Sequence, residues 1–257
     1  MTEIKGGSAA EQVARHMEDL IREGSLRPGV QLLAERELAT RLSVSRPTLR
    51  QGIKLLEEKG LLESHAGGAT VVAPLGTSIT DPLITLMSER PIETIDDYLE
   101  FRATVERMAA ALAAERGNDV DRAALTACME RIDRAHAPAD AALEAEADVD
   151  LHVTVYESSH NIVLLQIMRA LAGMLRTGVF YNRDRLYSRP EVRDVLRDQH
   201  RDIVEAILAR DPEAAGEAAA AHMFYTRHAL REIHAAEARL EISLRRIDGG
   251  NLSAPRR

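Results

Sequence analysis

Apolar residues recur with helical spacing in three short stretches near the N-terminus. The third stretch is the clearest, because Leu49, Ile53 and Leu56 follow one another at i, i+4 and i+7 and so share one helix face. Ser45 directly precedes this stretch, and its side-chain oxygen can cap a helix. The pattern therefore predicts three helices, at residues 9–23, 34–42 and 46–59, with a tight turn between the second and the third.

A β-hairpin is predicted directly after the third helix. Two short apolar stretches, residues 61–64 and 69–72, flank the sequence Ala66-Gly67-Gly68. Glycines at that place supply the backbone freedom that a tight hairpin turn needs. Two helices joined by a turn and followed by a hairpin form a winged helix-turn-helix, so the hairpin is interpreted as the wing and double-stranded DNA as the partner.

The basic residues of this region are concentrated on one helix. The whole chain carries a formal charge of −8, yet residues 1–75 hold ten Lys/Arg and ten Asp/Glu, so this part is neutral. Residues 36–54 contain five basic residues and a single acidic one, Glu37. Arg46, Arg50 and Lys54 follow at i, i+4 and i+8, beside the apolar stripe. This narrow basic stripe is typical of a recognition helix that enters a major groove.

After Pro74 the sequence consists of long helical patterns rich in Ala, Leu, Arg and Glu, with almost no strand signal. Counting the segments between breakers predicts an all-α bundle of six or seven helices. Aromatic residues make up only 3% of the chain, so aliphatic side chains must fill its core. The fold class is therefore mainly α, with these expected parts: a DNA-binding domain at 8–75, a linker and short helix at 76–93, the bundle at 94–235, and a helical extension with a frayed tail at 236–257.

Composition excludes several classes of protein. Cys128 is the single cysteine and cannot form an internal disulfide. No apolar run of 18 residues and no N-terminal apolar leader pattern occurs, which argues against a membrane partner. We therefore expect a soluble, cytoplasmic protein.

Polar residues within the apolar stripes of the bundle indicate a candidate metal site. Asp148 and His152 are four residues apart on one predicted helix, and within the acidic run 140–150 we expect Asp148 alone to turn inward. His200 and His222 lie on apolar or alanine-rich faces of later helices. Three imidazoles and a carboxylate suit Zn²⁺, with Ni²⁺ or Mn²⁺ as other choices. Spacing alone leaves open that these are surface or internally satisfied histidines, since nine histidines are scattered along the chain.

The stretch PGVQLLAERELATRLSVSRPTLRQGIKLLEEKGLLE resembles the N-terminal domain of GntR-superfamily bacterial transcription regulators, over roughly residues 8–74. The resemblance implies contacts to phosphates or base edges, and Ser45 at the helix start joins the DNA-binding set. The sequence departs from the family at Pro47 and at the wing, which reads HAGGATVV where many members have a basic or GxG-type tip. The residues assigned to DNA are Arg36, Ser45, Arg46, Thr48, Arg50 and Gly67.

Three further runs, IDDYLEFRATVERMAAALAAERGN, ADVDLHVTVYESSHN and RDQHRDIVEAILARDPEAAGEAAAAHM, resemble the ligand-binding FCD domain of the FadR branch, over roughly residues 80–235. Metal-binding members of that family use an Asp, a His four residues later and two further His. Those positions fall on Asp148, His152, His200 and His222. The resemblance thus implies a divalent metal and a small organic acid whose carboxylate coordinates it.

Arg102 is the expected second anchor for the acid, because the family's arginine at this position faces the metal cavity and a guanidinium can hold a carboxylate bidentately. The alternative is a helix-surface ion pair between Arg102 and Glu106 at i, i+4. The expected core of that helix is the stripe beside Arg102: Tyr98, Phe101, Val105, Met108 and Leu112.

These observations lead to one main hypothesis and two alternatives. The main hypothesis is a homodimeric transcription regulator, acting as a repressor, that binds a short palindromic operator and is controlled by a small carboxylate effector at a metal site. One alternative is a metal-dependent hydrolase fused to a DNA-binding domain, although no HExxH-type motif accompanies the histidines. The other alternative is a regulator in which the metal is purely structural. We expect a protein that is not an enzyme.

Overall fold

The computed structural model describes residues 8–65, 69–73, 91–176 and 184–251. Its contacts divide the chain into two units, one made of residues 1–86 and 161–174 and the other of residues 87–160 and 175–257. Each unit is described by itself below. Within the described residues, no helix is long and apolar enough to cross a membrane.

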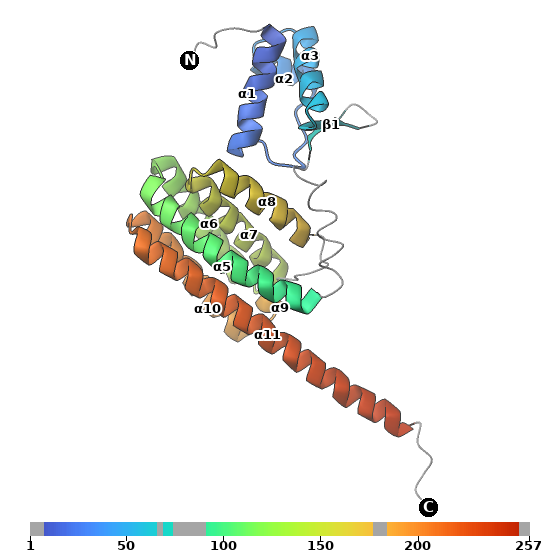
Figure 1. The fold of residues 1–257 in the computed structure, drawn as a ribbon, viewed down its shortest axis with the longest axis vertical. Coiled ribbons are helices and arrows are strands. Elements are labelled where there is room, and N and C mark those ends of the chain that lie inside the picture. The colour runs from blue at the N-terminus through green and yellow to red at the C-terminus, as the bar shows by residue number, and fades with distance from the viewer. Residues whose placement is uncertain (1–7, 66–68, 74–90, 177–183, 252–257) are drawn as a thin grey trace, which may run out of the picture. The chain divides into compact units, whose positions relative to one another are not determined.

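The first unit begins with the predicted winged helix-turn-helix (Figure 1). Met17, Leu49 and Leu56 are almost completely buried in its core. Gly52 lets α3 approach α1 closely, because a Cβ atom there would lie 2.9 Å from Val13 Cγ1. The elements are α1 (Ala9–Glu23), α2 (Glu35–Arg41), α3 (Arg46–Glu58), β1 (Leu62–Ser64) and β2 (Thr70–Val72).

The two strands form the predicted antiparallel hairpin, in which Leu62 pairs with Val72 and Ser64 with Thr70. An isolated bridge between Gln31 and Val71 adds a third extended segment beside β2. The turn between the strands, including Gly67, lies outside the described residues. The side chains of Leu62 and Val72 anchor the wing to the core of the unit.

All described elements after residue 90 are helices, which confirms the mainly α fold and the predicted six or seven helices. Six of them belong to the second unit, whereas α8 (Ile162–Arg176) lies mostly in the first. The helices of the second unit are α5 (Pro91–Arg116), α6 (Asp119–His136), α7 (Ala141–Ser158), α9 (Asp184–Tyr187), α10 (Pro190–Leu208) and α11 (Pro212–Asn251).

Helices α5 and α11 run antiparallel and pack through small side chains. A Cβ atom at Gly216 on α11 would lie 3.2 Å from Arg107 Cγ and 3.7 Å from Ala111 Cβ on α5, so a small residue permits the close approach. The expected stripe on α5 is wrong, because Phe101 and Met108 are nearly half exposed. The alanine-rich face packs inward instead, since it brings the two backbones closer together.

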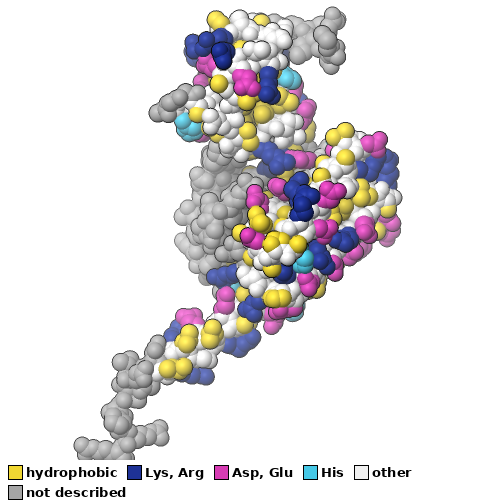
Figure 2. Space-filling view, turned by 180° about the vertical axis from the view of Figure 1, so that it is seen from behind, with side chains coloured by type: hydrophobic (Ala, Val, Ile, Leu, Met, Phe, Trp, Pro, Cys, Tyr) yellow, Lys and Arg dark blue, Asp and Glu magenta, His cyan; other side chains and the backbone are white. Residues whose placement is uncertain are grey.

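Helix α11 continues past the start of α5 as far as Asn251 (Figure 1). Large apolar side chains are exposed along this end of the helix (Figure 2). The expected frayed tail at residues 252–257 lies outside the described residues. The exposed apolar side chains on this end are Leu240, Ile242, Leu244 and Ile247.

Candidate DNA-binding surface and metal centre

Ser45 is the N-cap of α3, the helix predicted to read DNA. Its backbone is extended and its Oγ accepts a hydrogen bond from the Thr48 backbone N–H at 3.2 Å, as expected for an N-cap. Ser45 Oγ also lies 2.7 Å from Thr48 Oγ1. Capping holds both hydroxyls at the helix start, where backbone N–H groups and the helix dipole favour a phosphate.

The basic side chains of the first unit project from its surface. Arg46 and Arg50 on α3 have side chains 57% and 62% exposed, and Lys54 follows them with 74%. Arg36 on α2 is also exposed, whereas Thr48 is half-buried. The apolar stripe of α3 faces the core instead, so the helix can present its basic face to DNA without unpacking.

An acidic residue that sequence analysis missed lies against this basic stripe. Glu35 Oε2 accepts a hydrogen bond from Arg50 Nε at 2.7 Å and lies 3.9 Å from Arg46 Nη2. It stands one position before the basic window 36–54, and its nearness to α3 arises only when the two helices pack. Glu35 therefore occupies two of the arginines that the sequence assigns to DNA.

Replacing Glu35 with glutamine should tighten binding to a duplex of random sequence by about two- to five-fold at low salt, which is the range of one exposed ion pair. Fluorescence anisotropy measures this change. The matched control is Glu37→Gln, because Glu37 pairs with Arg41 on α2 itself. Weaker binding by the Glu35 variant would instead mean that Glu35 aligns Arg50 for DNA.

The four predicted metal ligands come together inside the second unit. Asp148 and His152 lie on α7, His200 on α10 and His222 on α11, and all four are at least 95% buried. One potential ligand atom from each lies within 4.8 Å of the others. Atoms bound to one Zn²⁺ lie at most about 4.2 Å apart, because each bond is about 2.1 Å long, so binding requires only a small contraction.

The donor atoms of this cluster are poorly satisfied within the protein. His200 Nε2 lies 3.1 Å from Asp148 Oδ1 and His152 Nε2 lies 3.5 Å from it, but neither pair is aligned as a hydrogen bond. His200 Nδ1 likewise has no hydrogen-bond partner. Three buried ring nitrogens that make no hydrogen bond are costly unless another group binds them. The donor set and its unmet bonds fit a divalent metal ion.

Further residues orient the imidazoles. His152 Nδ1 donates to Glu106 Oε2 at 3.0 Å, and His222 Nδ1 donates to Gln199 Oε1 at 3.1 Å. These bonds leave Nε2 of each ring as the atom that can ligate a metal. Tyr187 on α9 donates to Asp148 Oδ1 at 3.1 Å.

Charges behind the cluster are paired. Glu106 Oε1 accepts hydrogen bonds from Arg102 and Tyr156, whereas Glu106 Oε2 accepts the bond from His152. Burial would raise the pKa of Glu106, but His152 and Arg102 outweigh burial and lower it, so Glu106 stays ionised. Burial would lower the pKa of His152, but Glu106 and Asp148 raise it.

The other two imidazoles are held neutral. Burial lowers the pKa of His222 well below its ordinary value, and the nearby rings of His200 and His152 lower it further. Burial also lowers the pKa of His200, although Asp148 opposes the change. Neutral imidazole is the form that binds a metal, so His200 and His222 need not lose a proton near pH 7.

Arg102 has features of both roles considered from the sequence. It pairs with Glu106 as the alternative requires, yet both side chains are 2% exposed, so the expectation of a helix-surface bridge is wrong. Arg102 also lines the cavity that contains Asp148, His152 and His222. That cavity measures about 10 Å³, which is room for one ion or water molecule.

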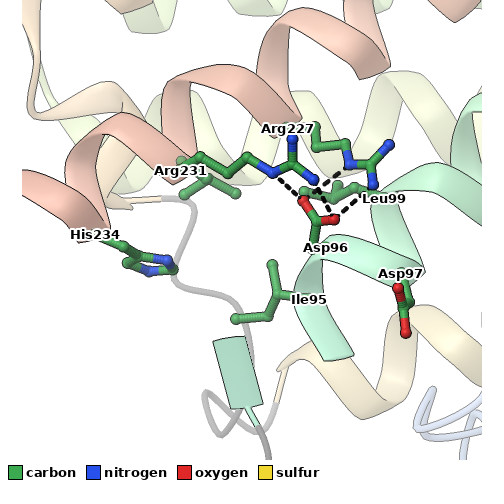
Figure 3. A pocket seen from close by; sticks show the side chains of 8 residues that line it. Ile95, Asp96, Asp97, Leu99, Arg227, Arg231 and His234 are labelled. Carbon is green, nitrogen blue, oxygen red and sulfur yellow. Dashed lines mark hydrogen bonds and ion pairs between the residues drawn. The ribbon is translucent and has the colours of Figure 1, made fainter. Parts of the chain in front are cut away.

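A larger cavity of about 290 Å³ lies between the start of α5 and the middle of α11 (Figure 3). Leu99 and Leu230 line it, one helical turn from Arg102 and Thr226, which line the small cavity. Its polar side consists of Asp96 held between two arginines. Asp96 Oδ1 accepts from Arg227 Nε at 2.9 Å, and Asp96 Oδ2 accepts from Arg231 Nη2 at 2.5 Å.

Asp96→Asn should lower the free energy of unfolding at pH 7 by about 1–2 kcal/mol, because it removes two ion pairs, one with Arg227 and one with Arg231. Hydrogen bonds from Arg227 and Arg231 lower the pKa of Asp96. A carboxylate whose pKa is lowered in the folded state stabilises the fold at any pH above its unfolded pKa of about 3.9. That stabilisation is lost as the pH falls from there toward the folded pKa. The difference between variant and wild type should therefore shrink below pH 4.

Urea unfolding at pH 7 and at pH 3.5 measures this difference. Asp97→Asn is the matched control, because Asp97 is an exposed neighbour for which no ion pair is seen within the described residues. Equal destabilisation by both variants would contradict the assignment.

Sequence analysis missed several residues around the site. Glu144 is buried and pairs with Arg193 and His136, so Asp148 is not the only inward member of the acidic run. The remaining missed residues carry a usable signal, because each lies four positions from a residue already assigned on the same helix. They are Tyr156 after His152 and Thr226 after His222, and for Glu106, already named as a partner of Arg102, the missed part is its hydrogen bond with His152.

Comparison with known proteins covers both units. Residues 9–72 match the bacterial regulatory proteins of the gntR family, and residues 97–224 match the FCD domain. The chain is 35% identical, over 90% of its length and 89% of the relative, to an Escherichia coli (strain K12) protein assigned to regulation of the L-lactate dehydrogenase operon.

Other relatives and a solved structure agree with these matches. The chain is 34% identical to the Glc operon transcriptional activator of the same strain, over 87% of this chain and 89% of that protein. It is 29% identical to the transcriptional repressor NanR of Salmonella arizonae, over 83% and 81%. The solved structure of Streptococcus agalactiae GntR matches with a TM-score of 0.50 and 26% identity, over 85% of this chain and 99% of that one.

Proposed function

This chain belongs to the GntR family of bacterial transcription regulators and carries an FCD domain, and from that premise we propose that a small organic acid, bound at a divalent metal in the second unit, controls its affinity for operator DNA. The relatives are regulators, and the chain is a transcription regulator rather than an enzyme. The hydrolase alternative is therefore set aside.

The observation that carries the proposal is the buried cluster of Asp148, His152, His200 and His222 with its unpartnered ring nitrogens. A cluster that served only to fill the core would leave these nitrogens unsatisfied at a cost of about 1–3 kcal/mol each. Zn²⁺ is the first choice of metal, with Ni²⁺ or Mn²⁺ also compatible with this donor set. Four protein ligands leave coordination positions open for an acid in a five- or six-coordinate site.

Arg102 is proposed as the second anchor for the acid. Its Nε and Nη2 already donate to Glu106, which holds the guanidinium in one orientation on the cavity wall. A guanidinium held in this way can still donate to a carboxylate oxygen of the acid. When bound, the metal would supply positive charge for the same carboxylate. Because the cavity has room for one ion or water, acid binding must be coupled to a rearrangement of the site.

We propose further that the protein acts as a homodimer on a short palindrome, because a two-fold dimer presents two recognition helices to two half-sites. Exposed Phe101 and Phe224, on the paired helices α5 and α11, are candidates for the dimer contact. The mass in solution should be twice the 28.3 kDa of one chain. We also propose that the protein is a repressor. A reporter gene fused to the operator tests this, because a repressor lowers its expression.

A thermal shift screen separates an effector-binding metal from a purely structural one. The metal-loaded protein is heated in the presence of short organic acids, each tested separately at millimolar concentration. An acid that binds only the folded state raises the melting temperature, because at 100 times its Kd it adds about 2.7 kcal/mol to the free energy of unfolding. If no acid changes the melting temperature of the metal-loaded protein, the structural alternative is correct.

A further inference from the structure

The C-terminal end of α1 receives hydrogen bonds from α8, a helix of the same unit that lies far along the chain. Gln166 Nε2 donates to Arg22 O at 2.8 Å and to Ile21 O at 3.3 Å. Arg169 Nη2 donates to Gly24 O at 3.1 Å. The last carbonyls of a helix have no partner within the helix, and the helix dipole favours a positive charge beside them. Gln166 and Arg169 therefore form a cap on the end of α1.

Gly24, the residue that ends α1, is suited to this cap. Its φ is 94°, a left-handed conformation that favours glycine. A Cβ atom there would lie 2.6 Å from both terminal nitrogens of Arg169. A larger residue at this position would therefore displace the guanidinium from the end of α1.

The sequence of α8 belongs to the FCD domain, although its contacts place it with the DNA-binding helices. Residues 161–174 are part of the first unit, yet they fall within the stretch that matches the FCD domain. In the chain, α8 follows α7, which carries Asp148 and His152, and precedes α9, whose Tyr187 donates to Asp148. Both neighbours of α8 in the chain thus bear residues of the metal site.

The connection from α7 to α8 is short and held by hydrogen bonds. It consists of residues 159–161. Ser159 Oγ donates to Tyr156 O at 2.6 Å, which ties the start of the connection to α7. Asn161 Oδ1 accepts from the Leu164 backbone N–H at 3.1 Å, which ties its end to α8. A connection held in this way transmits a displacement of α7 to α8, because it has little freedom to absorb it.

We infer that α8 couples the metal site to the DNA-binding helices, and that Gln166 and Arg169 are the positioning residues that complete this coupling. The inference rests on the proposed function, in which binding at the metal changes operator affinity. A metal that orders α7 would also order α8 and, through the cap, the end of α1. Helix α1 packs closely against α3, so a change in α1 reaches the helix that is predicted to read DNA.

Hydrogen–deuterium exchange of the full-length protein, followed by mass spectrometry, tests this coupling with Zn²⁺ alone as the probe. In the wild type, Zn²⁺ should slow exchange about five-fold, the lower end for coupled sites, both in α8 and in the last turn of α1. In the double variant Gln166→Ala/Arg169→Ala, α8 should still respond to Zn²⁺, whereas α1 should not. Arg169→Lys keeps the positive charge and a donor, so it should retain most of the α1 response.

Two further variants keep the test independent of the stability of the double variant. Gly24→Ala disrupts the cap from the α1 side and should remove the α1 response. Val163→Ala changes a residue of α8 that is 68% exposed, and it should keep the full response. Each variant is judged by the ratio of its exchange rates without and with Zn²⁺, so that a general loosening of α1 cancels.

Three results would overturn the inference and leave the metal site intact. They are an α1 that still responds in the double variant, an α8 that no longer responds there, and a wild type in which α7 responds but α1 does not. An equal loss in Val163→Ala would likewise overturn the role of Gln166 and Arg169. If the wild type binds no Zn²⁺, by elemental analysis, the proposed function fails and the inference fails with it.

Discussion

Replacing Arg46 and Arg50 together with alanine should weaken operator binding by at least about 30-fold, because each contact to a base edge or phosphate contributes about 1–3 kcal/mol. Both side chains are more than half exposed on α3 and make no contribution to the core. The double variant should therefore keep the melting temperature of the wild type. Fluorescence anisotropy with the DNA upstream of the protein's own gene, at a fixed low salt concentration, measures the loss.

Arg22→Ala is the matched control for this prediction. Arg22 is an arginine of similar exposure on α1, paired with Asp19 and away from the basic stripe. It should change operator affinity by less than two-fold. Equal losses in the control and the double variant would show that α3 does not read DNA and that overall charge dominates binding.

His200→Ala should remove the bound metal and the stability that depends on it. In the wild type, a metal at 1,000 times its Kd contributes about 4.1 kcal/mol to the folded state. For a domain of this size, that corresponds to a melting temperature lowered by roughly 10 °C when a chelator is added. The variant should bind less than a tenth of an equivalent of metal, by elemental analysis, and its melting temperature should not respond to chelator.

His228→Ala controls for the general effect of losing a histidine from the same unit, because His228 lies exposed on α11. It should keep one equivalent of metal per chain and the full response to chelator. Without metal, His200→Ala should be less stable than the wild type, because it leaves a cavity in the core and removes the 3.1 Å pair between His200 and Asp148, so the chelator response is the readout for metal binding. A chelator response that persists in His200→Ala would exclude this cluster as the metal site.

Much of the first unit could be predicted from the sequence because its signals are local. Leu49, Ile53 and Leu56 define the buried face of α3, and Ser45 caps it. The hairpin follows from two apolar stretches around glycines. Glu35 escaped prediction because its contact with Arg50 joins two helices, and such contacts depend on how the helices pack.

The second unit was harder to predict because its helices have more than one apolar face. On α5 the larger apolar side chains, such as Phe101, lie outward, and the alanine face packs against α11. Hydrophobicity alone favours the larger side chains, whereas close helix packing favours small ones. Buried charges add a second difficulty. Arg102 and Glu106 are inside because they neutralise each other and hold His152, which no single position reveals.

Positions on apolar helix faces gave the four metal ligands as a candidate set, and the family resemblance selected this set over other arrangements of the nine histidines. Spacing linked Asp148 to His152 on one helix, but the positions of His200 and His222 depend on how α10 and α11 pack against α7. The structure brings all four together and also shows their unpartnered nitrogens. Thr226 and its hydroxyl could be recognised only once the cavity was known.

The central claim is that acid binding at the metal changes operator affinity, which requires the acid to bind the DNA-competent and DNA-incompetent states unequally. Its most direct test measures operator binding by fluorescence anisotropy while an acid that raises the melting temperature in the thermal shift screen is added to the metal-loaded protein, to the chelated protein and to His200→Ala. The claim predicts that a saturating acid changes the operator Kd by about 10-fold in the loaded wild type alone. An unchanged operator Kd in the loaded wild type, or the same change in all three samples, would contradict it.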